Sequence, residues 1–304
     1  MTVRSRALGG AAVLLGLSLT AAGCASSPAR PSGAMWLTPP SGATPSGAGT
    51  SPTATSEATT EATSSPLPSG WSRQRFLKAF GKHKGTTHTA SPTVLNGLVG
   101  AVFTSNASGD HFCTASVVDS AGQNLIITAA HCVYDPGVGQ RNNLVFVPGY
   151  RAGETPNGVW PLAAITVDQS WADHGNPDLD VAFAIVQPQD GRQVQQVLGA
   201  NKLGIGKGYQ LDVRVTGYPS SSDEPITCVN QTVEQSPTQL RISCPDYTGG
   251  TSGSPWVTGF DPSTHTGTVV GVIGGYQQGG NTPDISYTSY FGSGVQALYD
   301  RATQ

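Results

Sequence analysis

Beyond residue 90, turn-forming residues divide the sequence into short apolar runs, and this pattern constrains the fold more than any other feature. The runs are rich in Val and Ile and are separated by Gly, Pro, Asn and Asp, which is typical of strands in a sandwich or barrel. A charged fraction of 12% and 39 glycines also favour turns and strands over long helices. Only residues 294–302 have a helical pattern, with Val295, Leu298 and Tyr299 on one side. We therefore expect an all-β domain with a C-terminal helix. The clearest runs are residues 98–103, 114–118, 125–129, 144–148, 181–186, 211–216 and 268–273.

Residues 1–23 have the pattern of an export signal. Arg4 and Arg6 precede an apolar run over residues 7–22, which is shorter than the ~20 apolar residues of a membrane helix. The run leads into Cys24 through small residues and resembles the bacterial lipobox, in which this cysteine receives a lipid and becomes the new N-terminus. Ala21 departs from that pattern, which usually has Leu there. We expect lipidation at Cys24; ordinary signal cleavage is the alternative.

The next segments link this signal to the folded domain. Residues 24–70 are almost all Ser, Thr, Pro, Ala and Gly, a composition that cannot bury enough apolar surface to fold, so we expect a disordered linker. A cleaved propeptide is the alternative. Residues 71–90 are a basic lead-in with aromatic side chains, either packed loosely on the domain or forming a short amphipathic helix at anionic lipid or wall polymer. The domain itself is expected over residues 91–304. No later segment is long and apolar enough to span a bilayer.

The chain has five cysteines, an odd number for a protein that leaves the cytoplasm. A lipid on Cys24 accounts for the odd one. The other four, Cys113, Cys132, Cys228 and Cys244, can then form two disulfides in an oxidising compartment. The predicted location is the outer face of the cell membrane, or the medium if the anchor is not used.

Three motifs carry chemistry, in the chain order His, Asp, Ser. They are Thr-Ala-Ala-His-Cys ending at Cys132, Asp-Val-Ala beginning at Asp180, and Gly-Thr-Ser-Gly-Ser-Pro beginning at Gly250. They resemble the T-A-A-H-C, D-[IL]-A and G-x-S-G-[GS]-P motifs of chymotrypsin-like serine peptidases, in that family's order. The resemblance covers residues 95–304 and is strongest to the bacterial branch with glutamyl endopeptidases and actinobacterial trypsin-like enzymes.

The resemblance implies two six-stranded antiparallel β-barrels with an active site between them. Ser252 is then the nucleophile of a serine endopeptidase and His131 the base that takes its proton, since imidazole titrates near neutral pH. Asp180 orients the imidazole. Asp173 and Asp178 lie nearby, but only Asp180 is followed directly by an apolar strand.

The same resemblance assigns further residues. The oxyanion hole is the backbone amides of Gly250 and Ser252, and one disulfide joins Cys113 to Cys132, which leaves Cys228 and Cys244 as the second pair. Gly274, Gly275 and Tyr276 are expected to bind substrate beside the specificity pocket. Asp246 occupies the place where trypsin-like members carry the acid that binds Lys or Arg; a simple turn aspartate is the alternative.

The position before the nucleophile is Thr251, where animal members have an acid that pairs with a newly cut N-terminus, so we expect no such ion pair here. The remaining histidines lack metal-ligand spacing, and we expect neither a metal nor a cofactor. A net charge of −3 indicates no nucleic-acid partner. The expected partner is a polypeptide substrate, bound by a monomer. The alternative function is a catalytically silent binding protein with the same fold. An α/β-hydrolase esterase fits poorly, because Ser254 stands where its motif needs Gly.

Overall fold

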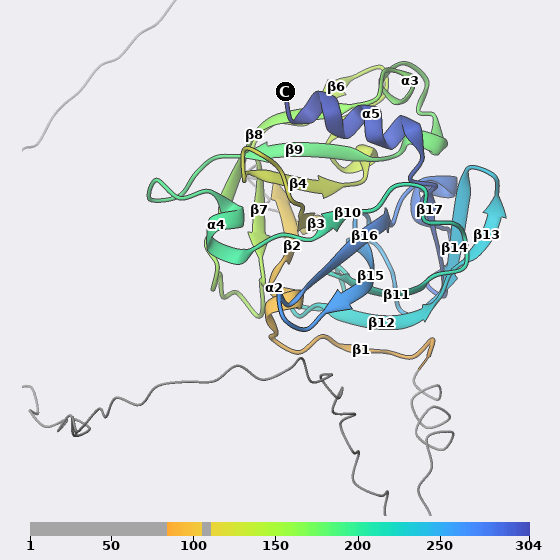
Figure 1. The fold of residues 1–304 in the computed structure, drawn as a ribbon, viewed down its shortest axis with the longest axis horizontal. Coiled ribbons are helices and arrows are strands. Elements are labelled where there is room, and N and C mark those ends of the chain that lie inside the picture. The colour runs from red at the N-terminus through yellow and green to blue at the C-terminus, as the bar shows by residue number, and fades with distance from the viewer. Residues whose placement is uncertain (1–83, 105–110) are drawn as a thin grey trace, which may run out of the picture. The chain divides into compact units, whose positions relative to one another are not determined.

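The computed structural model describes residues 84–104 and 111–304 of the chain (Figure 1), all of which belong to the unit Ser65–Gln304. The expected signal peptide, Cys24, the linker and residues 71–83 of the lead-in lie outside the described residues. Within the described ranges, no helix is long and apolar enough to cross a membrane.

The first half of the domain is a closed antiparallel barrel whose strands pair in the order β2, β3, β4, β9, β8 and β7. Five of these strands lie at predicted apolar runs. The sixth, β8, was not predicted because many of its residues are only half-buried or exposed, so its apolar pattern is weak. The strands are β2 (Val99–Thr104), β3 (His111–Val117), β4 (Leu125–Thr128), β7 (Leu144–Pro148), β8 (Trp160–Val167) and β9 (Ala182–Val186).

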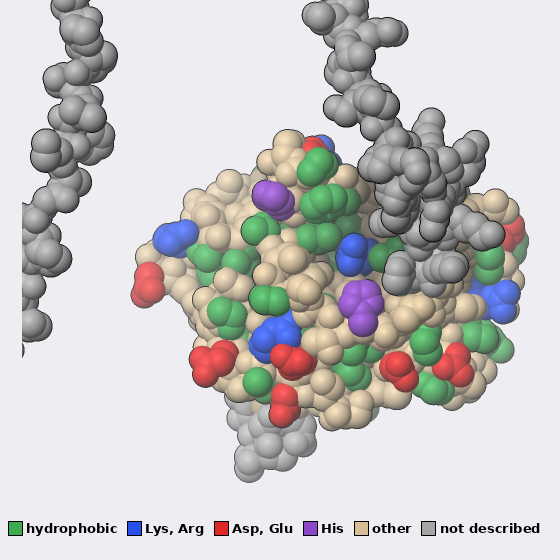
Figure 2. All heavy atoms as spheres, turned by 90° about the horizontal axis from the view of Figure 1, so that it is seen from below, with side chains coloured by type: hydrophobic (Ala, Val, Ile, Leu, Met, Phe, Trp, Pro, Cys, Tyr) green, Lys and Arg blue, Asp and Glu red, His purple; other side chains and the backbone are tan. Residues whose placement is uncertain are grey.

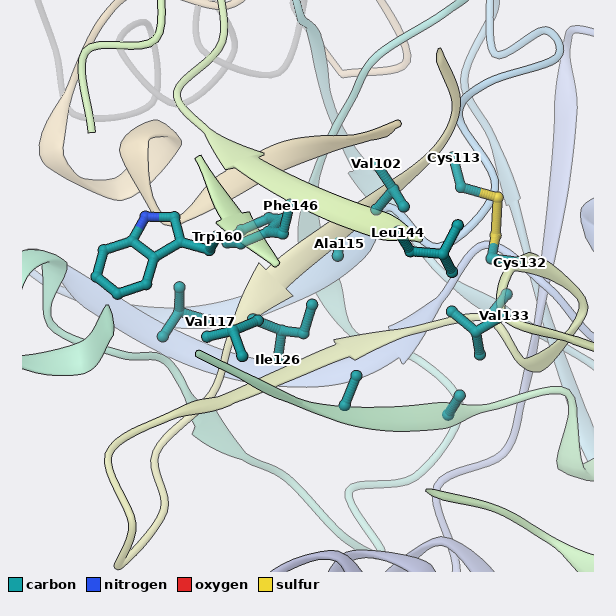
Figure 3. Close-up of a cluster of buried hydrophobic side chains, with 14 of the residues drawn as sticks. Val102, Cys113, Ala115, Val117, Ile126, Cys132, Val133, Leu144, Phe146 and Trp160 are labelled. Carbon is teal, nitrogen blue, oxygen red and sulfur yellow. A yellow bond between two sulfur atoms is a disulfide. The ribbon is translucent and has the colours of Figure 1, made fainter. Parts of the chain in front are cut away.

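Strand β4 shows how the apolar runs divide between two cores. Successive side chains of a strand point to opposite faces, and every residue of β4 is buried. Ile126 packs inside the barrel with Phe146 and Trp160 (Figure 3). Leu125 and Ile127 face the other way, into a second cluster that contains the C-terminal helix. A strand buried on both faces therefore appears in the sequence as a continuous apolar run.

The second half contains two sheets around one core. One sheet has the strand order β1, β12, β11, β15, β16, β10, and the other has the order β13, β14, β17. Val215 and Trp256 from the first sheet and Leu240 and Ile242 from the second belong to one buried cluster. The strands are β1 (Thr87–Thr89), β10 (Lys202–Leu203), β11 (Asp212–Gly217), β12 (Ile226–Gln231), β13 (Val233–Ser236), β14 (Gln239–Ser243), β15 (Pro255–Asp261), β16 (Thr266–Val272) and β17 (Ile285–Ser289).

The predicted all-β fold with a C-terminal helix is confirmed. The first half is the expected six-stranded antiparallel barrel, whereas the strands of the second half form sheets of six and three strands, with β10 and β16 parallel. The C-terminal helix, α5 (Ser293–Ala302), buries Val295, Leu298 and Ala302. The other elements are short connections between strands. They are α2 (Val94–Gly97), α3 (Gln169–His174), α4 (Val194–Leu198), the hairpin of β5 (Tyr134–Asp135) with β6 (Gly139–Gln140), and the 3-10 helices η1 (Ala130–Cys132), η2 (Pro177–Leu179) and η3 (Tyr276–Gly279).

The end of the expected lead-in is part of the fold. Strand β1 pairs antiparallel with β12, where Thr87 lies opposite Cys228. Lys84 forms a 2.8 Å ion pair with Asp212, and Ala90 is fully buried. Figure 2 shows the face on which β1 lies, where basic side chains are scattered and several acidic side chains follow the lower edge.

Both implied disulfides are present, Cys113–Cys132 and Cys228–Cys244. The second spans a separation of 16 residues and links β12 to the end of β14, across the hairpin of β13 and β14. Two disulfides indicate an extracytoplasmic location, since the cytosol keeps thiols reduced.

We predict that replacing Cys228 and Cys244 together by Ala lowers the free energy of unfolding by about 3 kcal/mol, because the bridge closes a loop in the unfolded chain. Alanine avoids burying a hydroxyl, since both cysteines are buried. Denaturant unfolding in non-reducing buffer measures the difference. A variant as stable as the wild type would show that this bridge does not stabilise the fold.

Candidate active site

His131 lies at the end of a buried strand. Strand β4 ends at Thr128, the chain continues through the buried Ala129, and η1 then carries His131. The adjacent Cys132 is bonded to Cys113 on β3. The His131 side chain is 14% exposed, so it reaches solvent from a fixed backbone.

The carboxylate of Asp180 holds the His131 segment. Asp180 directly follows η2, and its side chain is fully buried. Its Oδ2 atom accepts hydrogen bonds from His131 Nδ1 at 2.8 Å and from the Gly275 amide at 2.9 Å, and its Oδ1 accepts from the His131 amide at 2.9 Å. The two neighbouring acids point elsewhere: Asp173 accepts from Gln169, and Asp178 accepts from Gln239.

The bond to Asp180 determines which nitrogen of His131 can act as a base. A carboxylate can only accept a hydrogen bond, so Nδ1 carries the proton in the neutral ring. Nε2 then presents a lone pair. Among the described residues, no donor forms a hydrogen bond with Nε2.

The turn that contains Ser252 is bound to both halves of the domain. Thr114 on β3 donates from its amide to the Ser252 carbonyl at 2.7 Å and from its hydroxyl to the Gly250 carbonyl at 3.0 Å. The Gly253 amide donates to the Ile273 carbonyl at 2.7 Å, just beyond β16. A Cβ atom on Gly253 would lie 3.2 Å from the Ala129 amide, two residues before His131. The Ser252 turn therefore packs directly on the segment that carries the histidine.

Within residues 250–254, two amides make no hydrogen bond with any described residue. They belong to Gly250 and Ser252, whereas the amides of Thr251, Gly253 and Ser254 all donate within the protein. Gly250 has φ +94, a conformation that favours glycine. The Ser252 side chain also makes no hydrogen bond to His131 or to another described residue, which distinguishes this state from an engaged nucleophile and base.

No family model and no curated protein matches this chain. Among solved structures it is similar to the protease Anisep from Arthrobacter nicotinovorans, with 27% identity, 71% of this chain and 99% of that chain covered, and a TM-score of 0.61. It is also similar to the thermostable serine protease AL20 from an extremophilic microorganism, with 32% identity, 68% and 97% covered, and a TM-score of 0.60. This chain belongs to the chymotrypsin-like serine protease family. A Glu endopeptidase at 16% identity, with 73% and 98% covered and a TM-score of 0.58, shares the fold.

A cavity of about 300 Å³ lies beside Ser252, where members of this family bind a substrate side chain. Its walls are formed by residues 247–249 and 278–283 together with Thr251, Ser252 and Ile273, and no charged side chain lies among them. Asp246 is not part of the lining: it is exposed, in a turn with φ +71. The described structure therefore supports the turn alternative for Asp246 rather than a role in the pocket.

The backbone amides of the other expected substrate-binding residues all donate hydrogen bonds within the protein. The amide of Gly274 donates to Tyr287, that of Gly275 to Asp180, and that of Tyr276 to Gln239. These amides cannot pair with a substrate strand in this state. The segment instead ties the second half of the domain to Asp180.

Gln239 links segments on both sides of Asp180, through contacts that the sequence does not predict. Its Nε2 donates to the Pro177 carbonyl and to Asp178, both at 2.9 Å, and its Oε1 accepts from Tyr276 at 3.1 Å. It thereby holds η2, which precedes Asp180, against the Gly275 segment. A single glutamine in a strand has no distinguishing pattern in the sequence.

Among the described residues, one group of potential metal ligands adjoins the site, formed by Cys113, His131 and Cys132. The two cysteines are joined in a disulfide, so neither offers a thiolate. Thr251 is also satisfied locally: it is buried, and its hydroxyl and amide both donate to the Thr248 carbonyl. Hydrogen bonds within the turn therefore satisfy Thr251, the position at which animal members of the family carry an acid.

We predict that Thr114→Val destabilises the protein by about 1–3 kcal/mol more than Thr114→Ser does, because a buried carbonyl and a buried amide lose their partner. The Thr114 hydroxyl donates to Gly250 and accepts from Tyr218 at 3.0 Å. Serine keeps the hydroxyl and loses only a methyl group, whereas valine keeps the shape. Unfolding midpoints measure both. Equal destabilisation by the two variants would show that the hydroxyl does not hold the turn.

Proposed function

We propose that this protein is a serine endopeptidase, in which Ser252 is the nucleophile, His131 the general base and Asp180 the residue that orients the base. The observation that carries the proposal is the 2.8 Å bond from His131 Nδ1 to the buried Asp180 carboxylate. It leaves Nε2 as a free acceptor among the described residues, on a segment that packs against the Ser252 turn. A weak serine nucleophile requires such a base.

The first half-reaction forms an ester. His131 Nε2 takes the Ser252 hydroxyl proton as Oγ attacks the peptide carbonyl carbon, and the carbonyl oxygen becomes an oxyanion. The free amides of Gly250 and Ser252 are suited to donate to it, a contribution typically worth ~10²–10³ in rate for each donor. The C–N bond then breaks, and the proton on Nε2 passes to the departing amine.

Water reverses the sequence in the second half-reaction. Nε2 takes a proton from water, hydroxide attacks the ester, and the C–O bond to Ser252 breaks as Nε2 returns the proton to Oγ. Asp180 remains a carboxylate throughout and stabilises the imidazolium ion that forms in each half.

The cavity beside Ser252 supports a preference for neutral side chains. A residue whose carbonyl is attacked at Ser252 places its side chain in the nearest cavity, which has no charged group in its described lining. A charged side chain buried there would lose its hydration without gaining an ion-pair partner. This favours neutral residues before the cleaved bond over Lys, Arg, Asp or Glu.

We further propose that the protein is anchored to the outer face of the bacterial membrane by a lipid on Cys24. This proposal is supported by the signal-like residues 1–23 and by the odd number of cysteines. The linker of residues 24–70 would let the protease domain act at a distance from the membrane.

A second candidate function is a catalytically silent binding protein with a protease fold. It is favoured by one observation: the Ser252 hydroxyl makes no hydrogen bond to His131 among the described residues. Catalytic hydrogen bonds are often long in substrate-free states and tighten on binding. The peptidase proposal therefore has priority, and activity measurements separate the two.

We predict that Ser252→Ala lowers kcat for peptide hydrolysis by about 10⁶-fold, the scale found when a serine nucleophile is removed. Ser263→Ala, in the exposed loop between β15 and β16, is the control and is expected to leave turnover unchanged, because it retains the nucleophile and its turn. Steady-state kinetics on a peptide library measures both variants. No turnover by the wild type under any condition would favour the silent binding protein.

We predict that residues with neutral side chains before the cleaved bond are preferred over Arg and Lys by at least about tenfold in kcat/KM, because a buried unpaired charge costs more than ~1.4 kcal/mol. Asp246→Asn leaves this preference unchanged, since Asp246 lies outside the cavity lining. A preference for Arg or Lys that Asp246→Asn abolishes would contradict this assignment of the pocket.

A further inference from the structure

A second cavity, of about 390 Å³, lies on the other side of the Ser252 turn. Its lining includes Phe103, His111, Tyr150, Tyr218 and Asp223. The first two come from the barrel of the first half, whereas Tyr218 and Asp223 follow β11 in the second half. The cavity therefore joins both halves of the domain, as the cavity beside Ser252 does not.

Gly250 forms the wall between the two cavities. A Cβ atom on Gly250 would lie 2.7 Å from His111 Cε1 and 2.6 Å from Ser220 Oγ, and both of these residues line the second cavity. The neighbouring Gly249 and Ser252 line the first cavity. A peptide whose carbonyl lies at Ser252 with its preceding side chain in the first cavity must continue past Gly250. Its leaving portion then runs toward the second cavity.

The second cavity is an aromatic box. The rings of Phe103 and Tyr150 have centroids 5.2 Å apart at 68°, and those of Phe103 and His111 lie 5.4 Å apart. Tyr218 completes the group, 6.2 Å from Tyr150 and 6.3 Å from His111. These edge-to-face and tilted contacts hold the rings in defined orientations. Phe103, His111 and Tyr150 are partly exposed, whereas Tyr218 is buried, so the first three offer the ring surface that a ligand can reach.

The charges around this box favour a cation. Asp223 is exposed at its rim and forms no ion pair with any described residue. The adjacent Glu224 is occupied by Arg151. Burial lowers the pKa of His111, which is uncharged near neutral pH, and the His111 Nε2 atom lies 3.0 Å from the Cys113 carbonyl. Among its described lining residues, the cavity thus has one carboxylate, that of Asp223, and no lysine or arginine. The nearby Arg151 is neutralised by its ion pair with Glu224.

We propose that this cavity binds the side chain of an arginine or lysine in the part of a polypeptide substrate that follows the cleaved bond. The inference rests on the proposed peptidase function for the direction of the chain. Aromatic rings attract a cation through their quadrupoles, and guanidinium groups stack on them well. The Asp223 carboxylate supplies the opposite charge at the entrance.

The test uses peptides that share a neutral residue before the cleaved bond and differ only after it. At the second position after the bond they carry Arg, Lys, norleucine or Glu. Norleucine matches the length of lysine without its charge. We expect kcat/KM for Arg and Lys to exceed that for norleucine roughly 3- to 30-fold, the scale of a cation on aromatic rings.

Two variants of the full chain identify the source of this preference. Asp223→Asn is expected to reduce the preference for Arg and Lys, while Asp190→Asn, an exposed aspartate that lines neither cavity, leaves it unchanged. Equal rates for Arg and norleucine, or a preference that survives Asp223→Asn, would overturn the proposed site.

A binding measurement keeps this test separate from the test of catalysis. Dye-labelled peptides with Arg or norleucine are titrated into Ser252→Ala by fluorescence anisotropy, which requires no turnover. Tighter binding of the Arg peptide that is lost on adding Asp223→Asn supports the cation site, even if the wild type hydrolyses nothing. Equal binding of both peptides overturns it, and hydrolysis by the wild type would then leave the peptidase proposal standing.

Discussion

The buried carboxylate of Asp180 is the constraint on which the rest of the site depends. A charge removed from water is tolerated only when donors replace its hydration. Here the donors come from two segments far apart in the chain, the His131 helix and Gly275 beyond β16. Satisfying one charge therefore fixes the ring orientation of His131 and draws the second half of the domain against the first. Gln239 reinforces the same junction from the side of η2.

Thr114 has the corresponding role for the Ser252 turn. It comes from the first barrel, yet it binds two carbonyls of a turn that belongs to the second half. Its neighbour Cys113 is bonded to Cys132, next to His131. The histidine and the serine turn are thus attached to the same short stretch of β3. Side chains on rigid strands hold a site more accurately than flexible loops do.

Much of this arrangement could be predicted from the sequence, because motifs such as that around Ser252 encode local backbone chemistry. Runs buried on both faces, such as β4, also stand out as continuous apolar segments. The half-exposed strand β8 does not stand out in this way, because its apolar pattern is weak. The contacts of Thr114 and Gln239 could not be predicted either, because they depend on which distant segments the fold brings together. Asp246 shows a related limit: its position along the chain suggested a pocket residue, but it is exposed in a turn with positive φ and is not among the described lining residues of the cavity.

The central claim is that His131 and Asp180 activate Ser252 as a nucleophile, and covalent labelling tests it most directly. The full chain is incubated with an alkyl fluorophosphonate, which reacts with activated serines, and the intact mass and the modified peptide are determined by mass spectrometry. The account predicts one adduct per chain, located on Ser252, formed rapidly by the wild type and far more slowly by His131→Ala. An unlabelled protein, or an adduct on another residue, would contradict it.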